Sequence, residues 1–458
     1  MKSIAHPRRD SLVYEIRDIV RTAQALEKVG KTIIYENIGD PINRGHLPPD
    51  FLQEVLSKHL QDPRSFGYGP TQGILETRQY LCETRNREAG VSLQVDDILF
   101  FNGLGDAIST VYKALSSETR VLLPAPVYPS YYALEEFHSG RKPVQYLLKA
   151  HQNWSLPLEE IDELLSQHPD LGAILLVNPD NPTGKIHDAS SLKGIVELCK
   201  KHNVLLIVDE IYNEVCFPTK SCESIASHVE DLPCLSLRGL SKSVPWPGAR
   251  CGWIEFYNCD SSCELQELKF TLQQLKSMEV CATTLPQRIL PELCEHSQYS
   301  QNLKNQSELY AKRAREARVT LTKYPFVRVN EPEAALYLSL SLPWQEEVGP
   351  MPPLESESKE ILMPLWEKAP IDKKLSLYLL ASTGVCAVPM NSFHHPTPGL
   401  RITLLEPDDE KFQKMLQALG EGISRFMNHY GLQDIDPLEQ MPDSDFQYRK
   451  LQKSRSAV

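Results

Sequence analysis

Two stretches of the chain decide its fold: AILLVNPDNPTG at residues 173–184 and VLLIVDEIY at residues 204–212. Each begins with five apolar residues and passes directly into polar residues and turn formers. A continuous apolar run of this length predicts a strand that is buried on both faces, which is typical of parallel sheets. Residues 188–202, between the two runs, have a helical pattern. The two stretches therefore predict a strand–helix–strand unit.

The same alternation of strands and helices extends over most of residues 50–280. Turn formers separate the apolar runs, and no repeat of fixed period is visible. This pattern predicts an α/β fold with a mostly parallel sheet that is covered by helices on both faces. The expected strands lie at 97–101, 121–123, 173–177, 204–208, 234–237 and 252–256, and the expected helices at 50–62, 73–89, 106–115, 129–138, 188–202 and 263–278.

The pattern changes after about residue 280, where a smaller α+β domain is expected. Residues 300–323 and 408–430 predict helices, and short apolar runs predict strands at 336–342, 385–389 and 400–405. Residues 343–372 are rich in proline and acidic residues, so we expect a loop insertion there.

The boundaries of the expected domains follow from these changes. They are an N-terminal segment at 1–48 that joins the small domain, a large α/β domain at 49–290, the small C-terminal domain at 291–431 with its insertion at 343–372, and a tail at 432–458.

The composition of the chain argues against several classes of function. Its 458 residues include 48 Lys and Arg against 60 Asp and Glu, which gives a formal charge of −12. An acidic chain without a basic cluster is not typical of proteins that bind nucleic acid. No apolar run approaches the roughly 20 residues of a membrane span, and the start MKSIAHPRRDSLVYEI has no apolar segment of a secretory signal. We therefore expect a cytoplasmic protein that binds neither nucleic acid nor membrane.

The cysteines argue against a metal site. There are 11 of them, and they are scattered singly along the chain. The closest two, Cys259 and Cys263, have no second pair at the spacing of a metal site. This arrangement predicts reduced thiols in a cytosolic protein and no bound metal.

Unusual polar residues gather directly after the expected strands. Because the carboxyl ends of parallel strands meet at one edge of a sheet, where ligands bind, we expect these residues to line one pocket. They are Gly103-Leu104-Gly105, Asn178 to Gly184, Asp209 to Tyr212, and Ser241-Lys242.

Asp209 and Lys242 are the charged members of this set. Asp209 emerges from an apolar strand, and taken alone it fits either a helix N-cap or a carboxylate that is paired with a buried cation. Lys242 in GLSK fits a surface loop lysine, and it also fits a lysine in an apolar cleft whose pKa is lowered for Schiff-base chemistry. The residues alone leave both alternatives open.

Two features of the chain are typical of phosphate binding. Gly103-Leu104-Gly105 forms a strand-to-helix turn, where free backbone N–H groups favour an anion. Arg250 follows the loop VPWPGA and fits either a phosphate ligand or a surface ion pair. The glycines do not match the dinucleotide fingerprint, and the chain has no Walker-type GKS or GKT, so a nucleoside triphosphatase is not expected.

The motifs taken together resemble those of the class I/II aminotransferases, which are pyridoxal-phosphate enzymes of fold type I. The motifs NPDNPTG (178–184), DEIY (209–212) and SKSVPWPGAR (241–250) follow one another at intervals typical of this family. The resemblance covers about residues 30–430 and is greatest to the alanine aminotransferase-like branch. It also includes NIGDP (37–41), YGPTQG (68–73), APVYP (125–129), AALY (334–337) and GLRITLL (399–405).

The resemblance implies how pyridoxal 5'-phosphate would be held. Lys242 resembles the lysine that binds the cofactor as a Schiff base, and Asp209 resembles the carboxylate that pairs with the pyridine nitrogen. The remaining cofactor ligands that it implies are Asn181 and Tyr212 at the phenolic oxygen, Tyr128 on the ring face, and Gly103, Leu104, Gly105, Ser241 and Arg250 around the phosphate.

The resemblance also implies the substrate side and the assembly. Arg401 matches the arginine that clamps the substrate carboxylate, and Gly39 and Asn181 lie beside that group. Tyr68 matches a tyrosine that reaches the phosphate of the neighbouring subunit, which implies a homodimer. The fold implied is a large domain with a mostly parallel seven-stranded sheet and a smaller α+β domain.

Three positions depart from the family pattern. Gly239 and Gly105 stand where many relatives have hydroxyl residues near the phosphate, so phosphate binding would rest more on Arg250, Ser241 and backbone amides. Met390 replaces a glycine near the expected substrate side, which puts the geometry of that side in question.

The function that follows from the resemblance is amino transfer by a ping-pong mechanism through Lys242. The expected donor is alanine or another small or apolar L-amino acid, and the expected acceptor is a 2-oxo acid such as 2-oxoglutarate. Two alternatives keep the cofactor: a C–S β-lyase, and an aminotransferase of the aspartate or aromatic type. A ligand-binding regulator on the same fold is not expected, because only about thirty residues precede NIGDP.

Overall fold

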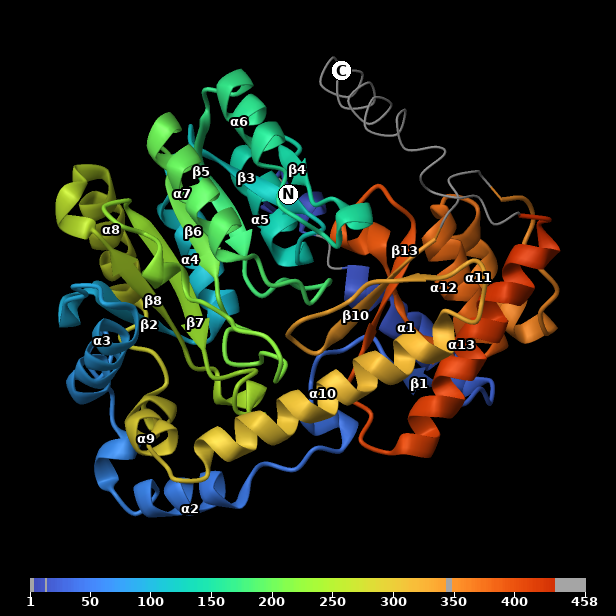
Figure 1. Cartoon of the computed structure of the whole chain (residues 1–458), viewed down its shortest axis with the longest axis horizontal. Coiled ribbons are helices and arrows are strands. Elements are labelled where there is room, and N and C mark those ends of the chain that lie inside the picture. The colour runs from blue at the N-terminus through green and yellow to red at the C-terminus, as the bar shows by residue number, and fades with distance from the viewer. Residues whose placement is uncertain (1–3, 13–14, 343–347, 433–458) are drawn as a thin grey trace.

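The computed structural model describes residues 4–12, 15–342 and 348–432. It confirms the predicted α/β class with its mostly parallel seven-stranded sheet. The sheet occupies the left of Figure 1, a smaller α+β part lies on the right, and the long helix α10 (Tyr299–Leu321) crosses the bottom between them.

Six of the seven strands run in the same direction, and β8 runs antiparallel to both of its neighbours. In spatial order the strands are β2 (Ile98–Phe101), β8 (Gly252–Tyr257), β7 (Cys234–Gly239), β6 (Leu205–Asp209), β5 (Leu171–Val177), β3 (Arg120–Ala125) and β4 (Gln145–Leu147). All six strands expected in this region are present. The short edge strand β4 was not predicted.

Alternate residues of the strands face opposite layers of helices. In β2, for example, Leu99 and Phe101 pack in one apolar cluster, whereas Ile98 and Phe100 pack in another. Burial on both faces is why the strands have continuous apolar sequences. The first layer contains α4 (Leu104–Ala114), α5 (Pro129–Ser139) and α8 (Cys263–Met278), and the second contains α3 (Leu75–Ala89), α6 (Leu158–Gln167) and α7 (Ala189–His202).

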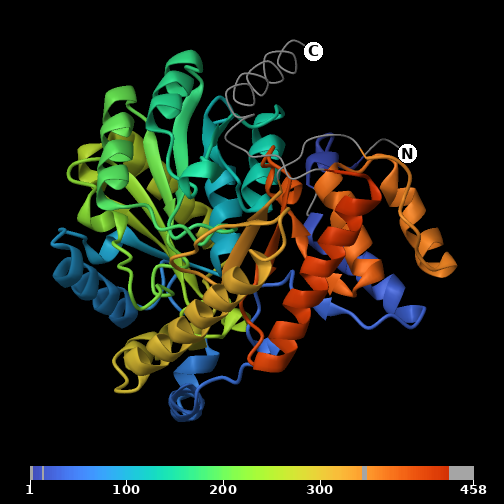
Figure 2. The same cartoon turned by 45° about the vertical axis from the view of Figure 1, so that its right-hand side comes forward.

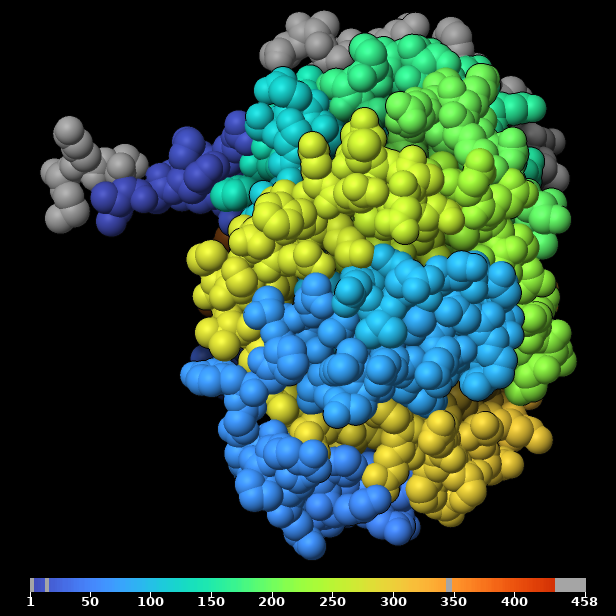
Figure 3. Space-filling view, turned by 90° about the vertical axis from the view of Figure 1, so that its left-hand side faces the viewer, coloured from blue at the N-terminus to red at the C-terminus, as the bar shows by residue number. Residues whose placement is uncertain are grey.

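Helices distant in sequence lie side by side at the end of the molecule shown in Figure 3. There the blue segment, with α2 (Asp50–His59) and α3, borders the yellow segment, with α8 and α9 (Thr284–Cys294). The apolar residues Phe51, Leu52 and Val55 of α2 pack with Ile289 and Leu293 of α9. This contact joins α2 to α9, at the end of the large part.

The smaller part contains an antiparallel sheet with the order β12-β13-β10-β9. A separate parallel pair joins β1 (Ile34–Tyr35) to β11 (Val385–Cys386). The strands of the sheet are β9 (Arg328–Val329), β10 (Tyr337–Ser341), β12 (Val388–Pro389) and β13 (Gly399–Thr403). The expected strand at 385–389 is therefore two short strands, β11 and β12, which belong to different sheets.

Helices cover this smaller sheet, and their arrangement is seen from a second side in Figure 2. Besides α10, they are α1 (Glu15–Lys28), α11 (Ser356–Trp366), α12 (Ile371–Ser382) and α13 (Asp409–His429). Their apolar faces form one core with β10 and β13.

The insertion at 343–372 is not only a loop, because helix α11 lies within it. Trp366 is 3% exposed, and its indole N–H donates to the carbonyl oxygen of Gly349 at 3.4 Å. Its ring centroid lies 6.5 Å from that of Phe426 in α13. Proline and acidic residues concealed the helix in the sequence, and its packing side consists of only a few residues. Residues 343–347 lie outside the described residues.

In the part of the chain that the structure describes, no helix is long and apolar enough to cross a membrane. The same residues contain no cluster of His, Cys, Asp or Glu side chains that would suit a metal ion.

The packing of α11 gives a stability prediction. Trp366→Ala should lower the free energy of unfolding by about 3–5 kcal/mol, because it leaves a cavity between α11 and α13. Leu365→Ala is the matched control, since Leu365 is 42% exposed, and its effect should stay within about 0.5 kcal/mol. Urea denaturation of both variants measures the difference. Equal effects would show that α11 does not pack as described.

Candidate active site

The candidate site lies at the carboxyl edge of the large sheet, where it meets the smaller part. Asp209 ends β6, the turn 178–184 follows β5, and Lys242 follows β7. Arg401 on β13 and the segment around Gly39 approach from the smaller part: Arg401 bonds Asn181, and Lys242 bonds Gly39.

Asp209 is a buried carboxylate that is held by neutral donors. One oxygen accepts the hydroxyl of Tyr131 at 2.9 Å, and the other accepts the backbone N–H of Ile211 at 3.0 Å. Burial raises the pKa of Asp209 to about 6, although these two hydrogen bonds and the charge of Lys242 act to lower it. No Lys, Arg or His of residues 4–12, 15–342 and 348–432 forms an ion pair with it. A buried carboxylate with free capacity suits a cationic ligand.

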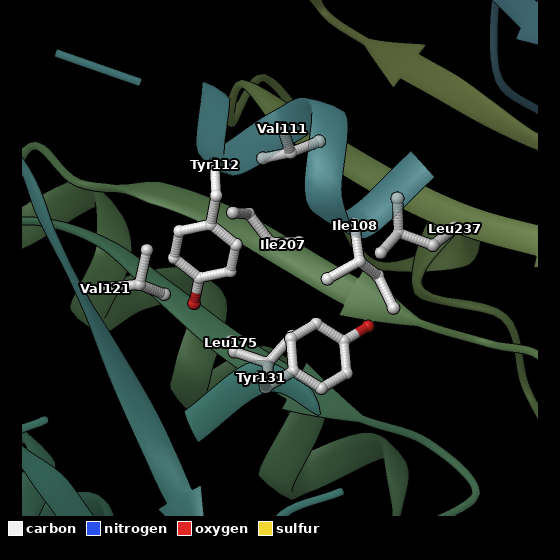
Figure 4. Close-up of a pocket in the computed structure, with 8 residues that line it drawn as sticks. All are labelled: Ile108, Val111, Tyr112, Val121, Tyr131, Leu175, Ile207 and Leu237. Carbon is white, nitrogen blue, oxygen red and sulfur yellow. The ribbon is translucent and has the colours of Figure 1, made fainter. Parts of the chain in front are cut away.

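The surroundings of the Tyr131 ring, whose hydroxyl binds this carboxylate, are apolar. A small cavity lies behind Tyr131, between α4, α5 and the sheet, and the rings of Tyr112 and Tyr131 both lie against it (Figure 4). The other lining residues are all aliphatic: Ile108, Val111, Val121, Leu175, Ile207 and Leu237. Because these lining residues are apolar, the polar partners of Asp209 are the hydroxyl of Tyr131 and the backbone N–H of Ile211.

Lys242 follows β7 of the large sheet and contacts the smaller part through Gly39. Its Nζ donates to the carbonyl oxygen of Gly39 at 2.7 Å and lies 5.9 Å from the ring centroid of Tyr212. The side chain is only half-buried, and the carbonyl is its one hydrogen-bond partner among the described residues. The amine is therefore available for exchange with a ligand.

Two tyrosines meet beside Lys242. The hydroxyl oxygens of Tyr212 and Tyr337 lie 3.1 Å apart, and their rings cross at 77°. Burial raises the pKa of Tyr212 well above its ordinary value, and the hydroxyl of Tyr337 adds to the rise. Gly39 lies against this pair, since a Cβ at position 39 would lie 2.0 Å from the hydroxyl oxygen of Tyr337. A glycine is therefore required there.

Arg401 is 2% exposed, yet it is not fully paired. It donates to the carbonyl oxygen of Asn37 and, at 3.5 Å, to Oδ1 of Asn181. The guanidinium lies 4.3 Å from the ring centroid of Tyr337 and 5.1 Å from that of Phe393. Its Nε has no partner among the described residues. A buried cation without an acidic partner suits a carboxylate ligand.

The turn after β5 fixes Asn181. The carboxylate of Asp180 accepts the hydroxyl of Thr183 at 2.6 Å and its N–H at 3.1 Å. Burial raises the pKa of Asp180 to about 7, because these bonds only partly offset the loss of water. This closed turn leaves the Asn181 side chain directed to Arg401.

The turn after β2 has the geometry of an anion site. Gly103 has φ +83° and precedes the first turn of α4. A Cβ at Gly105 would meet nothing within 4 Å, so the helix end is open, and a Cβ at Gly103 would lie 2.5 Å from Nη2 of Arg250. Leu104 packs against Gly239, one of the positions that depart from the family pattern. A Cβ at Gly239 would lie 2.7 Å from the carbonyl oxygen of Cys251 and 3.0 Å from Leu104. A serine at position 239, at the end of β7, therefore does not fit beside Leu104 and Cys251.

Other expected residues lie at the rim of the site or outside it. Tyr128 is half-buried at the start of α5, close enough to Tyr131 and Tyr212 to raise the pKa of both. Ser241 is half-buried beside Lys242, and Arg250 is exposed. Tyr68 is 87% exposed, and no hydrogen bond or ring contact joins it to another described residue.

Sequence reasoning missed three residues of the site and left one in question. Tyr131, Tyr337 and Asn37 bind Asp209, Tyr212 and Arg401, respectively. Asn37 and Tyr337 lie in the motifs NIGDP and AALY, but no role was assigned to them, and Tyr131 lies outside the motifs. Met390 is 1% exposed and packs against Gly399, where a Cβ would lie 2.8 Å from its γ carbon. It therefore supports β13 from behind.

Comparison with known proteins agrees with this geometry. The profile of the family "Aminotransferase class I and II" matches residues 37–419. An uncharacterized aminotransferase of Methanocaldococcus jannaschii is 38% identical over 91% of this chain and 97% of its own length. The glutamate-pyruvate aminotransferase AlaA of Escherichia coli is 29% identical over 72% and 80%. An alanine aminotransferase structure from Pyrococcus furiosus superposes with a TM-score of 0.79 at 26% identity, covering 93% of this chain and 100% of its own.

The fold and the site thus define an enzyme of fold type I that uses pyridoxal phosphate. The chain belongs to the class I and II aminotransferases, and the resemblance drawn from its motifs is confirmed.

Gly39 gives a prediction for the site. Gly39→Ala should lower kcat/KM for amino transfer by about 10- to 100-fold, because the new methyl displaces the ring of Tyr337. Gly39→Ala with Tyr337→Phe should recover part of the loss. Gly349→Ala is the control, since its Cβ meets nothing within 4 Å. Unchanged activity in Gly39→Ala would contradict the close contact.

Proposed function

We propose that the enzyme transfers the amino group of a small or apolar L-amino acid, such as alanine, to a 2-oxo acid such as 2-oxoglutarate in two half-reactions. The observation that carries this proposal is the convergence of three buried or half-buried charges on one cleft: Lys242, Asp209 and Arg401. Among the described residues, the Lys242 amine bonds only to a carbonyl oxygen, the Asp209 carboxylate forms no ion pair with a cation, and the Arg401 guanidinium forms none with an acid. One bound cofactor and one substrate carboxylate would satisfy all three.

The residues present fit pyridoxal phosphate. Asp209 would hold the pyridine nitrogen, Lys242 would bind the cofactor covalently as a Schiff base, and Tyr128 would cover the ring. Asn181 and Tyr212 would bind the phenolic oxygen. The phosphate would lie at the open end of α4, held by Gly103, Leu104, Gly105, Ser241 and Arg250. When bound, the cofactor supplies the carbonyl carbon that takes the amino group and the electron sink for the substrate Cα.

The chain's own residues would then orient the substrate and move its proton. Arg401 would bind the α-carboxylate with its planar fork, next to Asn181 and Gly39. That contact holds the Cα–H bond toward Lys242. The freed Nζ of Lys242 would take this proton as general base and return it as general acid. Asp209, which accepts the hydroxyl of Tyr131, would keep its negative charge where the cofactor ring needs a counter-ion.

The substrate class is supported by the relatives. Two of them are described as a glutamate-pyruvate aminotransferase and an alanine aminotransferase. The test is an assay with alanine and 2-oxoglutarate that measures pyruvate and glutamate, with aspartate and phenylalanine as competing donors. Alanine should have the highest kcat/KM. A preference for aspartate or phenylalanine would reject the substrate assignment, and ammonia with pyruvate released without an acceptor would replace it by a lyase.

Lys242→Ala should reduce amino transfer below detection, because no other described amine lies beside Gly39 and Tyr212. The far-ultraviolet circular dichroism spectrum should stay unchanged. Lys185→Ala is the control: Lys185 also follows a strand of the sheet, but it pairs with Glu333 at 3.0 Å. Its removal should leave most activity. Retained transfer in Lys242→Ala would reject the assignment of this lysine.

We also propose a homodimer in which Tyr68 reaches the phosphate of the partner subunit. The support is an exposed apolar surface made of Phe66, Tyr68, Met278 and Val280, which are 72, 87, 79 and 47% exposed. Hydrogen bonds from Thr71 to Val280 and from Thr284 to Gly67, each 2.9 Å, hold its two segments together. The surface lies near Arg250, because the hydroxyl of Thr283, the residue before Thr284, lies 3.4 Å from the carbonyl oxygen of Arg250.

Sedimentation of the active enzyme should give twice the chain mass of 51.9 kDa. Tyr68→Phe should weaken cofactor binding by about 3- to 10-fold, because one hydrogen bond to a charged group is lost. It should not change the sedimentation coefficient. An active monomer, or cofactor affinity equal to that of the wild type, would contradict the shared site.

A further inference from the structure

A fully buried lysine lies beside the proposed phosphate turn. Lys276, near the end of α8, has a side chain that is 0% exposed. Its Nζ lies 3.0 Å from Oδ2 of Asp106, 2.5 Å from Oε2 of Glu279 and 5.1 Å from the ring centroid of Phe101. A lysine is rarely buried to this degree, and its charge requires partners. Neither the motifs nor the proposed chemistry gives Lys276 a role.

Asp106 ties together the two ends of the turn that contains Gly103 and Gly105. It lies in the first turn of α4, and its Oδ2, besides pairing with Lys276, accepts the backbone N–H of Asn102 at 2.8 Å. Asn102 is the last residue before the turn. One carboxylate thus fixes the conformation of the turn. In it the N–H of Gly103 donates to the carbonyl oxygen of Phe101, and the N–H groups of Leu104 and Gly105 have no backbone acceptor among the described residues.

The same network reaches Arg250. Oδ1 of Asn102 accepts the N–H and the hydroxyl of Thr283, each at 2.9 Å. The Thr283 hydroxyl also lies 3.4 Å from the carbonyl oxygen of Arg250. Contacts therefore connect Lys276 to the backbone of Arg250, through Asp106, Asn102 and Thr283. The guanidinium of Arg250 packs on Gly103.

The charge of Asp106 creates a conflict at this helix end. A carboxylate in the first turn stabilises α4 through the helix dipole. A phosphate bound at the same end is also an anion, and two like charges disfavour each other over a few ångströms. Glu279 adds a second carboxylate nearby. Lys276 is the cation that lies between these two carboxylates.

We propose that Lys276 is a positioning residue of the cofactor phosphate site: it neutralises Asp106 so that the same turn binds a dianion. The inference rests on the proposed function, since it needs the phosphate at the end of α4. It predicts that loss of Lys276 weakens binding of the phosphate and leaves binding of the ring unchanged.

The test compares two ligands, pyridoxal phosphate and pyridoxal, in titrations of the full-length apoenzyme followed by absorbance. Lys276→Met should raise the Kd of pyridoxal phosphate at least about tenfold and leave that of pyridoxal within about twofold. Adding Asp106→Asn should recover most of the loss, because the uncompensated charge is then removed. Lys276→Arg, which keeps the charge, should bind both ligands nearly as the wild type does.

Lys269→Met is the matched control. Lys269 lies on the same helix, pairs with Asp97 at 2.6 Å and lies 5.8 Å from the ring centroid of Phe256, away from the turn. Its removal should change neither Kd.

Three results would overturn the inference while the proposed function stands: wild-type affinity for pyridoxal phosphate in Lys276→Met, an equal loss for both ligands, or no recovery with Asp106→Asn. If Lys276→Met does not fold, the double variant and Lys276→Arg still decide it, since both should bind pyridoxal phosphate. A wild-type chain that binds no pyridoxal phosphate would reject the proposed function itself, and the inference with it.

Discussion

The rest of the site depends on a buried carboxylate without a cation. Asp209 ends the central strand β6, and its donors among the described residues are both neutral. An apolar cavity adjoins Tyr131, one of these donors. Its pKa of about 6 reflects that position, since burial outweighs its hydrogen bonds. A protonated pyridine nitrogen is the kind of partner that would offset this loss of water. Its neighbour Glu210 faces a different environment and pairs with Arg238 at 2.6 Å, so strand β6 is anchored independently of the ligand.

The site is complete only where the two parts of the molecule meet. Asp209, Lys242 and Asn181 belong to the large sheet, whereas Arg401, Tyr337 and Gly39 belong to the smaller part. Within the site, three polar contacts cross this boundary: Lys242 with Gly39, Tyr212 with Tyr337, and Asn181 with Arg401. Such contacts exchange readily for bonds to a ligand. A substrate that binds Arg401 and the cofactor would hold the two parts together and exclude water from the cleft.

Much of the large part could be predicted from the sequence, because continuous apolar strands and intervening helices leave clear patterns. The three-residue strand β4 is too short for a pattern, and the antiparallel direction of β8 is not encoded in hydrophobicity at all. Helix α11 contains Pro364 and begins with acidic residues, and these features predict a loop when only the sequence is considered. The site was visible where a residue belonged to a motif, as with Lys242 and Arg401. Tyr131 and Lys276 were not visible, because they lie outside the motifs and only tertiary contacts distinguish them from core or surface residues. Asn37 lies in the motif NIGDP, but its role depends on a contact with Arg401 that only the structure shows.

The most direct measurement is the absorbance of the purified chain between about 300 and 450 nm after incubation with pyridoxal phosphate, before and after a single amino acid is added without any 2-oxo acid. We expect a band at about 420 nm that alanine shifts to about 330 nm, as expected when a Schiff base is converted to an amine. Absence of the first band would contradict the assignment of Lys242 and Asp209. A band that persists with every amino acid would contradict amino transfer.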